Sequence, residues 1–317
     1  MPRRTLPGRD AELWALAAHP TDSDIYATAG DDMTVRVWSI SLSRMLRKAQ
    51  VDSPVRCLAW SPDGKRLLLG MGGSSDGKRR KKDGAFLMLN ALTLAPLFEG
   101  RDARHWIRDC RYSPDGKTFA IGSTDQKIYL YDASSTVLRA KCVKHNAAIQ
   151  CVDFSSDSAY VQSDGIDFEH LYHSSMDGAH FKLPSQLKNV QWETWSCIYG
   201  WPVQGIWPSM ADTKFGGKAE PSCVQRSCDG KMLAAGYEDG TLRVYRYPCL
   251  EKRAEYVADR VGKSPVSRIA WTADDKHLVA IGRADRAIYV FDVAALEQGG
   301  AASVAGTALT EASTKGQ

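Results

Sequence analysis

The stretch "TVRVW" (Thr34–Trp38) decides the fold, because three later stretches repeat its chemistry. Those copies are "KIYLY" (Lys127–Tyr131), "TLRVY" (Thr241–Tyr245) and "AIYVF" (Ala287–Phe291). Each copy is apolar at its second and fourth positions, which is the period-2 pattern of a strand with one face in a core. An aspartate stands three residues before the first of these apolar positions, where we expect it to form the turn into the strand. The four aspartates are Asp32, Asp125, Asp239 and Asp285.

A second turn motif lies upstream of these strands. It occurs as "SPDGK" at Ser61–Lys65 and Ser113–Lys117, as "SCDGK" at Ser227–Lys231 and, in a weaker form, as "TADDK" at Thr272–Lys276. Proline fixes φ at the second turn position and glycine accepts a left-handed conformation, so we expect tight hairpin connections here. Another apolar strand precedes each turn. The repeated unit is therefore strand, turn, strand, turn, strand.

The period of this unit indicates the architecture. From Trp38 to Phe291, six steps average about 42 residues, which is within the range of the four-stranded blade repeat called WD40. The pattern predicts an all-β WD40-type β-propeller at residues 11–293, with about seven four-stranded blades and a degenerate fifth repeat. A β-sandwich is the alternative, but it would not require so constant a period.

The two ends of the chain fall outside this repeat. Residues 1–10 could contribute a closing strand to the last blade, and residues 294–317, rich in Gly, Ala, Ser and Thr, are predicted to be a disordered tail. How the ring closes stays open at this point. Either a terminal strand completes the last blade, or the chain is part of a longer protein that supplies it.

The amino-acid composition limits which classes of protein this chain can belong to. With 44% hydrophobic and 25% charged residues the chain is typical of a globular protein. The net charge of +4 is too small to require a polyanionic partner for the whole surface, so any basic site must be local. No apolar run is long enough for a membrane span. Eight cysteines without a Cys-x-x-Cys pair favour a reducing compartment, and we expect a cytoplasmic protein.

The most prominent local feature is the basic run Lys78–Lys82. Compared with the third unit, the second unit has ten additional residues between its second and third strands, so we expect a long loop on one rim of the disc. The candidate partner-binding residues are Lys78, Arg79, Arg80, Lys81 and Lys82, joined by Arg101 and Arg104. Such a loop would be attracted to an acidic macromolecular surface. The alternatives are a solvated charge run without a partner and a nuclear localisation patch. Nucleic acid is disfavoured because no aromatic residue interrupts the run.

Other candidate sites have structural explanations. His145 stands four residues before a strand, where blades often carry a histidine that hydrogen-bonds internally. Glu169, His170 and His173 resemble a ligand cluster, but the two histidines do not share a strand face, so no metal site is predicted. No dinucleotide, phosphate-loop or nucleophile-elbow motif is present. We therefore expect no catalytic residue, no cofactor and no small-molecule substrate. We expect the tryptophans from Trp192 to Trp207 either to fill a core or to anchor a partner protein.

Several stretches resemble the C-terminal propeller of echinoderm microtubule-associated protein-like proteins. They are "ELWALAAHP" (Glu12–Pro20), "ATAGDDMTVRVWS" (Ala27–Ser39), "NVQWETWSC" with "GIWP", and "DGKMLAAGYEDGTLRVYRYPC" (Asp229–Cys249). The resemblance covers residues 8–293. It implies a non-enzymatic protein associated with tubulin or microtubules, or with other cytoskeletal proteins, and its expected locations are the cytoplasm and cytoskeleton, with a cilium or flagellum as a further one. A generic WD40 scaffold in a signalling, trafficking or ciliary complex is the alternative.

This sequence departs from that family in three respects. Proteins of the family pair two interlocked discs, and a trimerising coiled coil and a hydrophobic motif precede the discs. This sequence shows no heptad segment, no second disc and no counterpart of the motif. The resemblance therefore transfers no individual tubulin-binding residue to a position in this chain, and it does not bring the avidity of a trimer.

Overall fold

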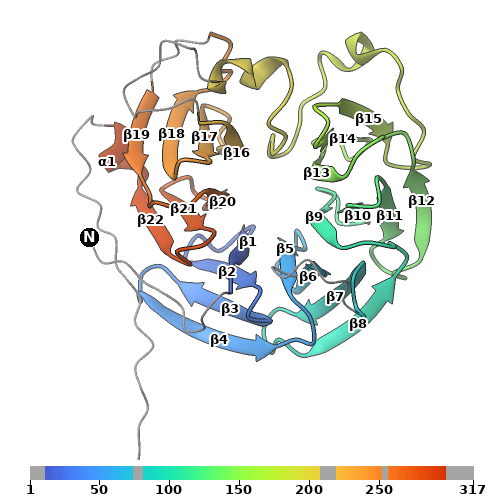
Figure 1. The fold of residues 1–317 in the computed structure, drawn as a ribbon, viewed down its shortest axis with the longest axis horizontal. Coiled ribbons are helices and arrows are strands. Elements are labelled where there is room, and N and C mark those ends of the chain that lie inside the picture. The colour runs from blue at the N-terminus through green and yellow to red at the C-terminus, as the bar shows by residue number, and fades with distance from the viewer. Residues whose placement is uncertain (1–10, 74–80, 208–218, 252–255, 298–317) are drawn as a thin grey trace, which may run out of the picture.

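A computed structural model of the chain describes residues 11–73, 81–207, 219–251 and 256–297. In these residues 22 strands form six antiparallel sheets, arranged as blades around a central axis (Figure 1). Blades 1 to 3 are four-stranded: β1 (Leu13–Ala18), β2 (Ile25–Gly30), β3 (Thr34–Ser39), β4 (Arg44–Gln50); β5 (Val55–Trp60), β6 (Arg66–Met71), β7 (Ala85–Asn90), β8 (Pro96–Arg101); β9 (Ile107–Tyr112), β10 (Thr118–Ser123), β11 (Ile128–Asp132), β12 (Leu138–Cys142).

The last three sheets include a longer connection, which separates the fourth sheet from the fifth. They contain β13 (Ile149–Phe154), β14 (Tyr160–Gly165), β15 (His170–Ser174); β16 (Pro221–Arg226), β17 (Met232–Tyr237), β18 (Thr241–Arg246), β19 (Tyr256–Arg260); β20 (Val266–Trp271), β21 (His277–Gly282), β22 (Ile288–Asp292). Two 3₁₀ helices, η1 (Pro184–Leu187) and η2 (Trp201–Ile206), lie between β15 and β16, and a short helix α1 (Val293–Glu297) follows β22. The WD40-type propeller is thus confirmed.

The prediction of about seven four-stranded blades is wrong, because the structure shows six blades. Two of the six have three strands among the described residues. The fifth sequence unit forms no sheet of its own there; it contributes η1, η2 and one isolated bridge between Ser155 and Trp192. Prolines at the start of both helices and the positive φ of Gly200 interrupt any extended run in this segment. Most of its aromatic residues pack inward, and Trp192 and Trp195 belong to a buried cluster, whereas Trp201 is exposed.

The ends of the chain are partly described. Residues 1–10 and 298–317 lie outside the described residues, so the expected closing strand and most of the expected tail do too. The first and last blades meet directly, because Leu13 N donates to Arg283 O at 3.0 Å and Ser267 Oγ donates to Leu13 O at 2.8 Å. Leu296 in α1 is buried, so the first residues beyond Val293 pack against the propeller.

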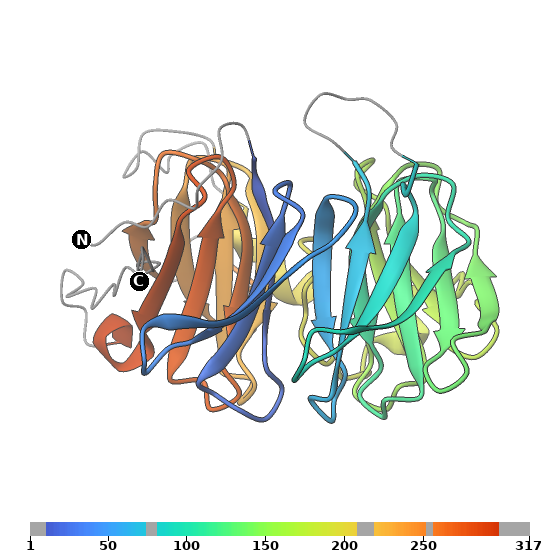
Figure 2. The same cartoon turned by 90° about the horizontal axis from the view of Figure 1, so that it is seen from below.

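The disc has two faces, which carry different connections between the strands of each blade. The turns that lead from the innermost strand of a blade to its second strand lie on one face, which we call the turn face. The connections from the second to the third strand lie on the opposite face, where each innermost strand begins (Figure 2). We call this the loop face. The described ends of the connection that carries the basic run lie on the loop face, because this connection joins β6 to β7 within one sheet.

Candidate partner-binding face

The connection that carries the basic run has a fixed stem on the loop face. Gly72 N donates to Pro54 O at 3.0 Å, and Gly73 N donates to the buried carboxylate of Asp83 at 2.9 Å. Gly72 has a φ of +114°, and a Cβ there would meet the side chain of Trp106 at 2.6 Å. Only glycine fits this close approach. The cations of the run are therefore attached to the disc at two defined points.

The predicted cations have different environments. Lys78, Arg79 and Arg80 lie outside the described residues, and Lys81 is exposed. Lys82 is paired on both sides, with Asp52 at 3.0 Å and Glu99 at 2.8 Å, and the hydrogen bonds to Glu99 and Asp52 raise its pKa. Two carboxylates thus more than offset the single charge of Lys82, which gives this residue a role in holding the loop to β8.

Arg101 and Arg104 are both exposed on the same face. Arg101 Nη1 donates to Lys81 O at 2.9 Å, so the structure brings Arg101 to the stem of the basic run. Arg104 instead contacts the next blade through its backbone, where its N–H donates to Asp125 Oδ2 at 2.7 Å. The cationic edge formed by the described residues is therefore Lys81 and Arg101, with Lys82 neutralised beneath them.

The aspartates singled out from the sequence lie in the turns before the third strand of their blades. Asp32 accepts from Thr34 N and pairs with Arg36 at 2.8 Å. Asp239 accepts from both the N–H and the hydroxyl of Thr241. The other two accept a tyrosine hydroxyl from the strand that follows: Tyr129 donates to Asp125 at 2.8 Å and Tyr289 donates to Asp285 at 3.4 Å.

The histidines of blade 4 are also held by hydrogen bonds or by packing. His145 is buried and its Nε2 lies 2.7 Å from Ser163 Oγ; burial lowers its pKa. His170 Nδ1 lies 2.6 Å from Asp164 Oδ1, and His173 is fully buried beside His145.

Two groups at this blade and the connection that follows it bring candidate metal ligands within 4.8 Å of one another: Asp164 with His170 and Cys197, and His145 with Asp167 and Glu169. In the first group the carboxylate is already bonded to His170, and burial raises the pKa of the Cys197 thiol well above its usual value. The first group is thus held together as a hydrogen-bonded pair beside a buried thiol.

Sequence reasoning missed a second cationic group on the loop face, at the mouth of the central channel. We call it the channel arginines: Arg56, Arg108, Arg268 and Arg283. Arg56 connects this group to the basic run, because its Nε donates to Gly72 O at 3.1 Å. The signal in the sequence is a charged residue that follows the first apolar residue of an inner strand, as in "VRC" (Val55–Cys57) and "IRD" (Ile107–Asp109).

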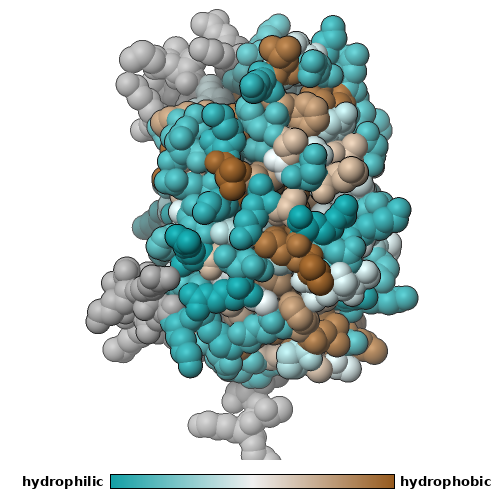
Figure 3. Space-filling model, turned by 90° about the vertical axis from the view of Figure 1, so that its right-hand side faces the viewer, coloured by the Kyte–Doolittle hydropathy of each residue, from teal (hydrophilic) through white to brown (hydrophobic). Residues whose placement is uncertain are grey.

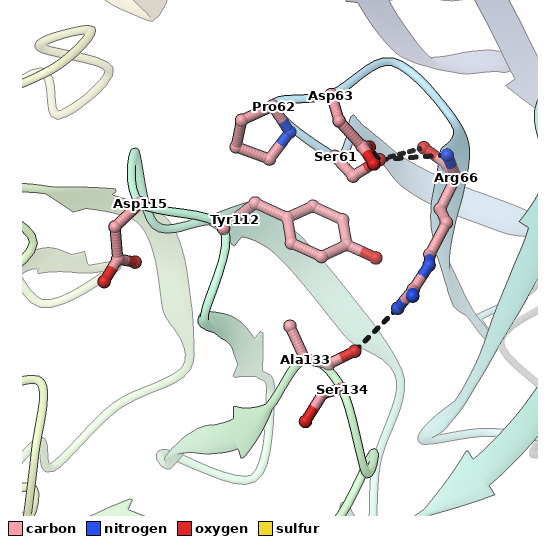
Figure 4. Close-up of a pocket in the computed structure, with 9 residues that line it drawn as sticks. Ser61, Pro62, Asp63, Arg66, Tyr112, Asp115, Ala133 and Ser134 are labelled. Carbon is pink, nitrogen blue, oxygen red and sulfur yellow. Dashed lines mark hydrogen bonds between the residues drawn. The ribbon is translucent and has the colours of Figure 1, made fainter.

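The turn face carries a polar groove of about 250 Å³ between blades 2 and 3 (Figure 4). Ser61 and Asp63 approach it from one hairpin and Asp115 from the next, while Arg66 Nη1 reaches across to Ala133 O at 2.7 Å. A hydrogen bond from Ser61 lowers the pKa of Asp63, and burial raises the pKa of Tyr112. These shifts move both groups away from neutral pH, which disfavours acid–base chemistry in the groove.

The outer wall of the disc is less distinctive. Seen from the side of blades 3 and 4, it is mostly hydrophilic with small, separate apolar patches (Figure 3). Val137 and Val143, which flank β12, are more than half exposed. Scattered apolar residues of this kind are normal on a protein surface. Within the described ranges, none of the helices has the length and apolarity that a bilayer crossing requires.

Comparison with known proteins decides the family. A family model described as "Echinoderm microtubule-associated protein second beta-propeller" matches residues 13–293. The chain belongs to this family. The predicted resemblance to echinoderm microtubule-associated protein-like proteins is thereby confirmed.

Curated relatives of this second-propeller family agree with the match. Echinoderm microtubule-associated protein-like 2 of Mus musculus is 28% identical over 293 residues, which is 90% of this chain and 42% of the relative. Echinoderm microtubule-associated protein-like 4 of Homo sapiens is 29% identical over 286 residues, 89% of this chain and 28% of the relative. The 77 kDa echinoderm microtubule-associated protein of Strongylocentrotus purpuratus is 26% identical over 278 residues. The chain spans less than half the length of each of these relatives.

Solved structures with a similar fold have lower identity. The crystal structure of RRP9 WD40 repeats has a TM-score of 0.67 at 15% identity and covers 90% of this chain, with 96% of its own length matched. The structure of U3-55K has a TM-score of 0.64 at 14% identity, with coverages of 90% and 97%. At this identity the likeness shows the propeller fold alone. The family match and the fold together support a non-enzymatic role in protein interaction.

Proposed function

We propose that this propeller is the protein-binding module of a microtubule- or tubulin-associated cytoskeletal protein, and that it meets its partner with the loop face. The family match over residues 13–293 carries the proposal. Its curated relatives are named as microtubule-associated proteins. Partners in the cytoskeleton, and a location there, follow from the same proposal.

The charges of the loop face support this choice of surface. Lys81 and Arg101 lie exposed at the stem of the basic run, and the sequence adds Lys78, Arg79 and Arg80 beside them. Lys82 is the one member of the run that we assign to the loop's attachment, because it lies between Asp52 and Glu99. An excess of cations on one face attracts an acidic surface and raises the rate of encounter.

Microtubule co-sedimentation at low salt tests the proposal. The loop-face variant changes Lys78, Arg79, Arg80 and Lys81 to Ser and retains Lys82, so that the attachment of the loop survives. The matched control removes four exposed lysines from the turn face: Lys65, Lys117, Lys231 and Lys276 are changed to Ser. Both variants lose the same net charge.

We expect the wild type and the turn-face control to pellet with microtubules and the loop-face variant to bind about tenfold more weakly or worse. Because a single propeller binds without avidity, the same three proteins are also displayed on a trimeric coiled coil. Absence of pelleting by every form, including the trimers, would exclude tubulin. In that case affinity capture of a stable assembly without tubulin would favour a generic scaffold.

A further inference from the structure

A ring of β-bulges surrounds the channel at the loop face. Each of the six innermost strands has a register shift after its first residue, so that its second residue is skipped in the pairing with the neighbouring strand. The skipped residues are Trp14, Arg56, Arg108, Gln150, Ser222 and Ser267, and all six line one cavity of about 30 Å³. A bulge re-aims a side chain, and bulges recur next to binding sites. Here six of them direct six side chains to one point.

Arginine and tryptophan alternate around part of this ring. The guanidinium carbons of Arg56 and Arg283 lie 4.5 and 4.6 Å from the centroid of the Trp14 ring. Arg56 is also 5.5 Å from the Trp106 ring, and Arg108 is 5.9 Å from it. Contacts within about 6 Å are attractive and hold a guanidinium over an aromatic face. The two rings therefore fix three cations that come from three different blades.

The charges of the channel arginines are only partly compensated. Arg56 Nη2 pairs with Asp31 at 2.7 Å, and Arg268 Nη2 pairs with Asp109 at 3.0 Å. Among the described residues Arg108 and Arg283 form no ion pair, although Glu12 and Glu238 lie within electrostatic range of the group. Burial, and then the neighbouring arginines, lower the pKa of Arg108. The channel mouth thus holds two arginines, Arg108 and Arg283, that have no ion-pair partner among the described residues and lie in a partly buried place.

Two of the channel arginines also have hydrogen-bond donors without a partner among the described residues. In the part of the chain that the structure describes, Arg56 Nη1 and Arg283 Nε are buried without a hydrogen-bond partner. A buried donor without a partner costs about 1–3 kcal/mol, so such groups are usually satisfied by something. An oxyanion satisfies both the charge and the donors, because a guanidinium offers paired N–H groups to paired oxygens.

The size of the cavity selects the kind of oxyanion. A water molecule occupies at least about 10–15 Å³ on this measure, so about 30 Å³ admits roughly two oxygen-sized atoms. That matches the two oxygens of a carboxylate better than the four of a phosphate. A glutamate or aspartate side chain projects its carboxylate on a narrow stem, whereas a phosphodiester keeps its anion between two bulky sugars.

We propose that the channel mouth on the loop face binds the carboxylate of an acidic side chain in an extended segment of a partner protein. Arg108 and Arg283 are the residues that we assign to ligand contact. Arg56 orients the site and, through Gly72, couples it to the stem of the basic run. This inference stands apart from the proposed function, because it requires no tubulin.

Fluorescence anisotropy of a fluorescein-labelled hexaglutamate peptide, with hexaglutamine as the neutral control, tests the site. The channel variant is Arg108→Gln with Arg283→Gln, which leaves the buried pairs of Arg56 and Arg268 intact. The matched rim variant is Lys81→Gln with Arg101→Gln, which removes the same charge from the same face outside the channel. Circular dichroism melting confirms that each variant is folded.

We expect the wild type to bind hexaglutamate and not hexaglutamine, with a loss of about tenfold or more in the channel variant and about threefold or less in the rim variant. Equal losses in the two variants would mean that only diffuse charge attracts the peptide, and would overturn the site. So would absence of hexaglutamate binding to the wild type. Competition by inorganic phosphate or by a single-stranded DNA oligomer at lower concentration than free hexaglutamate would overturn the choice of a carboxylate.

Discussion

The two faces of the disc compensate their cations differently. On the turn face Lys117, Lys231 and Lys276 each pair with the aspartate two residues earlier, at 3.6, 2.9 and 3.5 Å. On the loop face Arg108 and Arg283 form no ion pair among the described residues, and Arg101 is bonded to a backbone carbonyl. The lysines of these turns are therefore locally neutralised, whereas, within the described part of the chain, Arg108 and Arg283 on the loop face are not.

This difference follows from the geometry of the connections. A Ser-x-Asp or Thr-x-Asp turn places its carboxylate close to the lysine two residues later, and in three of these turns the two groups form an ion pair. Connections on the loop face vary in length, and the bulged inner strands below them turn side chains toward the axis. The repeated turns thus stabilise the turn face, whereas the bulges and the irregular connections give the loop face side chains that are available for binding.

The largest expected effect is at the buried pair beneath the channel mouth. Arg268→Met leaves Asp109, which is 2% exposed, without its cation. Because an unpaired buried carboxylate is costly, we expect the free energy of unfolding to fall by about 3–5 kcal/mol. Urea denaturation measures the change.

The control for this prediction is Lys117→Met on the turn face, where an exposed pair contributes about 0–1 kcal/mol. The double variant Arg268→Met with Asp109→Asn should recover part of the loss, since it removes the stranded charge. A similar small cost for Arg268→Met and Lys117→Met would contradict the proposed difference between the faces.

A smaller effect is expected at the stem of the basic run. Asp83→Ala removes the buried acceptor of the Gly73 N–H, which should cost about 1–3 kcal/mol. Asp115→Ala on the turn face also removes an acceptor, but a solvent-accessible one, and should cost about 1 kcal/mol or less. Thermal melting of the two variants side by side measures the difference. If Asp115→Ala lowered the melting temperature more than Asp83→Ala, the stem of the basic run would not be the more firmly fixed of the two elements.

The smallest expected effect is the response of the turn face to acid. Hydrogen bonds from serine hydroxyls lower the pKa of Asp63 and Asp157, and bring that of Asp229 to about 2. Because the folded pKa is depressed, the stabilisation is fully present above about pH 4 and is lost as the pH falls toward about 2. Changing these three aspartates to Asn should flatten the decline in melting temperature over that window. An unchanged decline would mean that other carboxylates cause it.

Much of the fold could be predicted from the sequence, because alternation and turn chemistry are local signals. The strands around Thr34–Trp38 and its copies are found where the pattern places them, and Gly64, Gly116 and Gly230 all have the expected positive φ. The blade count failed in the segment between His173 and Ala219. There a count based on period assigned a blade to residues whose described part forms two short helices, isolated bridges and a largely buried aromatic cluster.

The site was harder to predict, because it depends on contacts between distant residues. Lys82 looks like any other cation of the basic run, and its pairing with Asp52 and Glu99 appears only when β7, β8 and the preceding connection are placed together. The bulged arginines were visible as charges inside apolar strands, yet their convergence on one axis requires the closed ring. Local sequence patterns predict individual strands, whereas the convergence of distant residues on one site follows from the topology of the closed ring.

The most direct measurement of the central claim is the ratio of microtubule affinities for the loop-face and turn-face quadruple variants, measured together at about 0.05 M and 0.15 M salt. Surface attraction weakens as the Debye length shortens, so the ratio should be largest at low salt. We predict that only the loop-face variant loses binding, by about tenfold or more at the lower salt concentration. Equal affinities of the two variants at both salt concentrations would contradict the assignment of partner binding to the loop face.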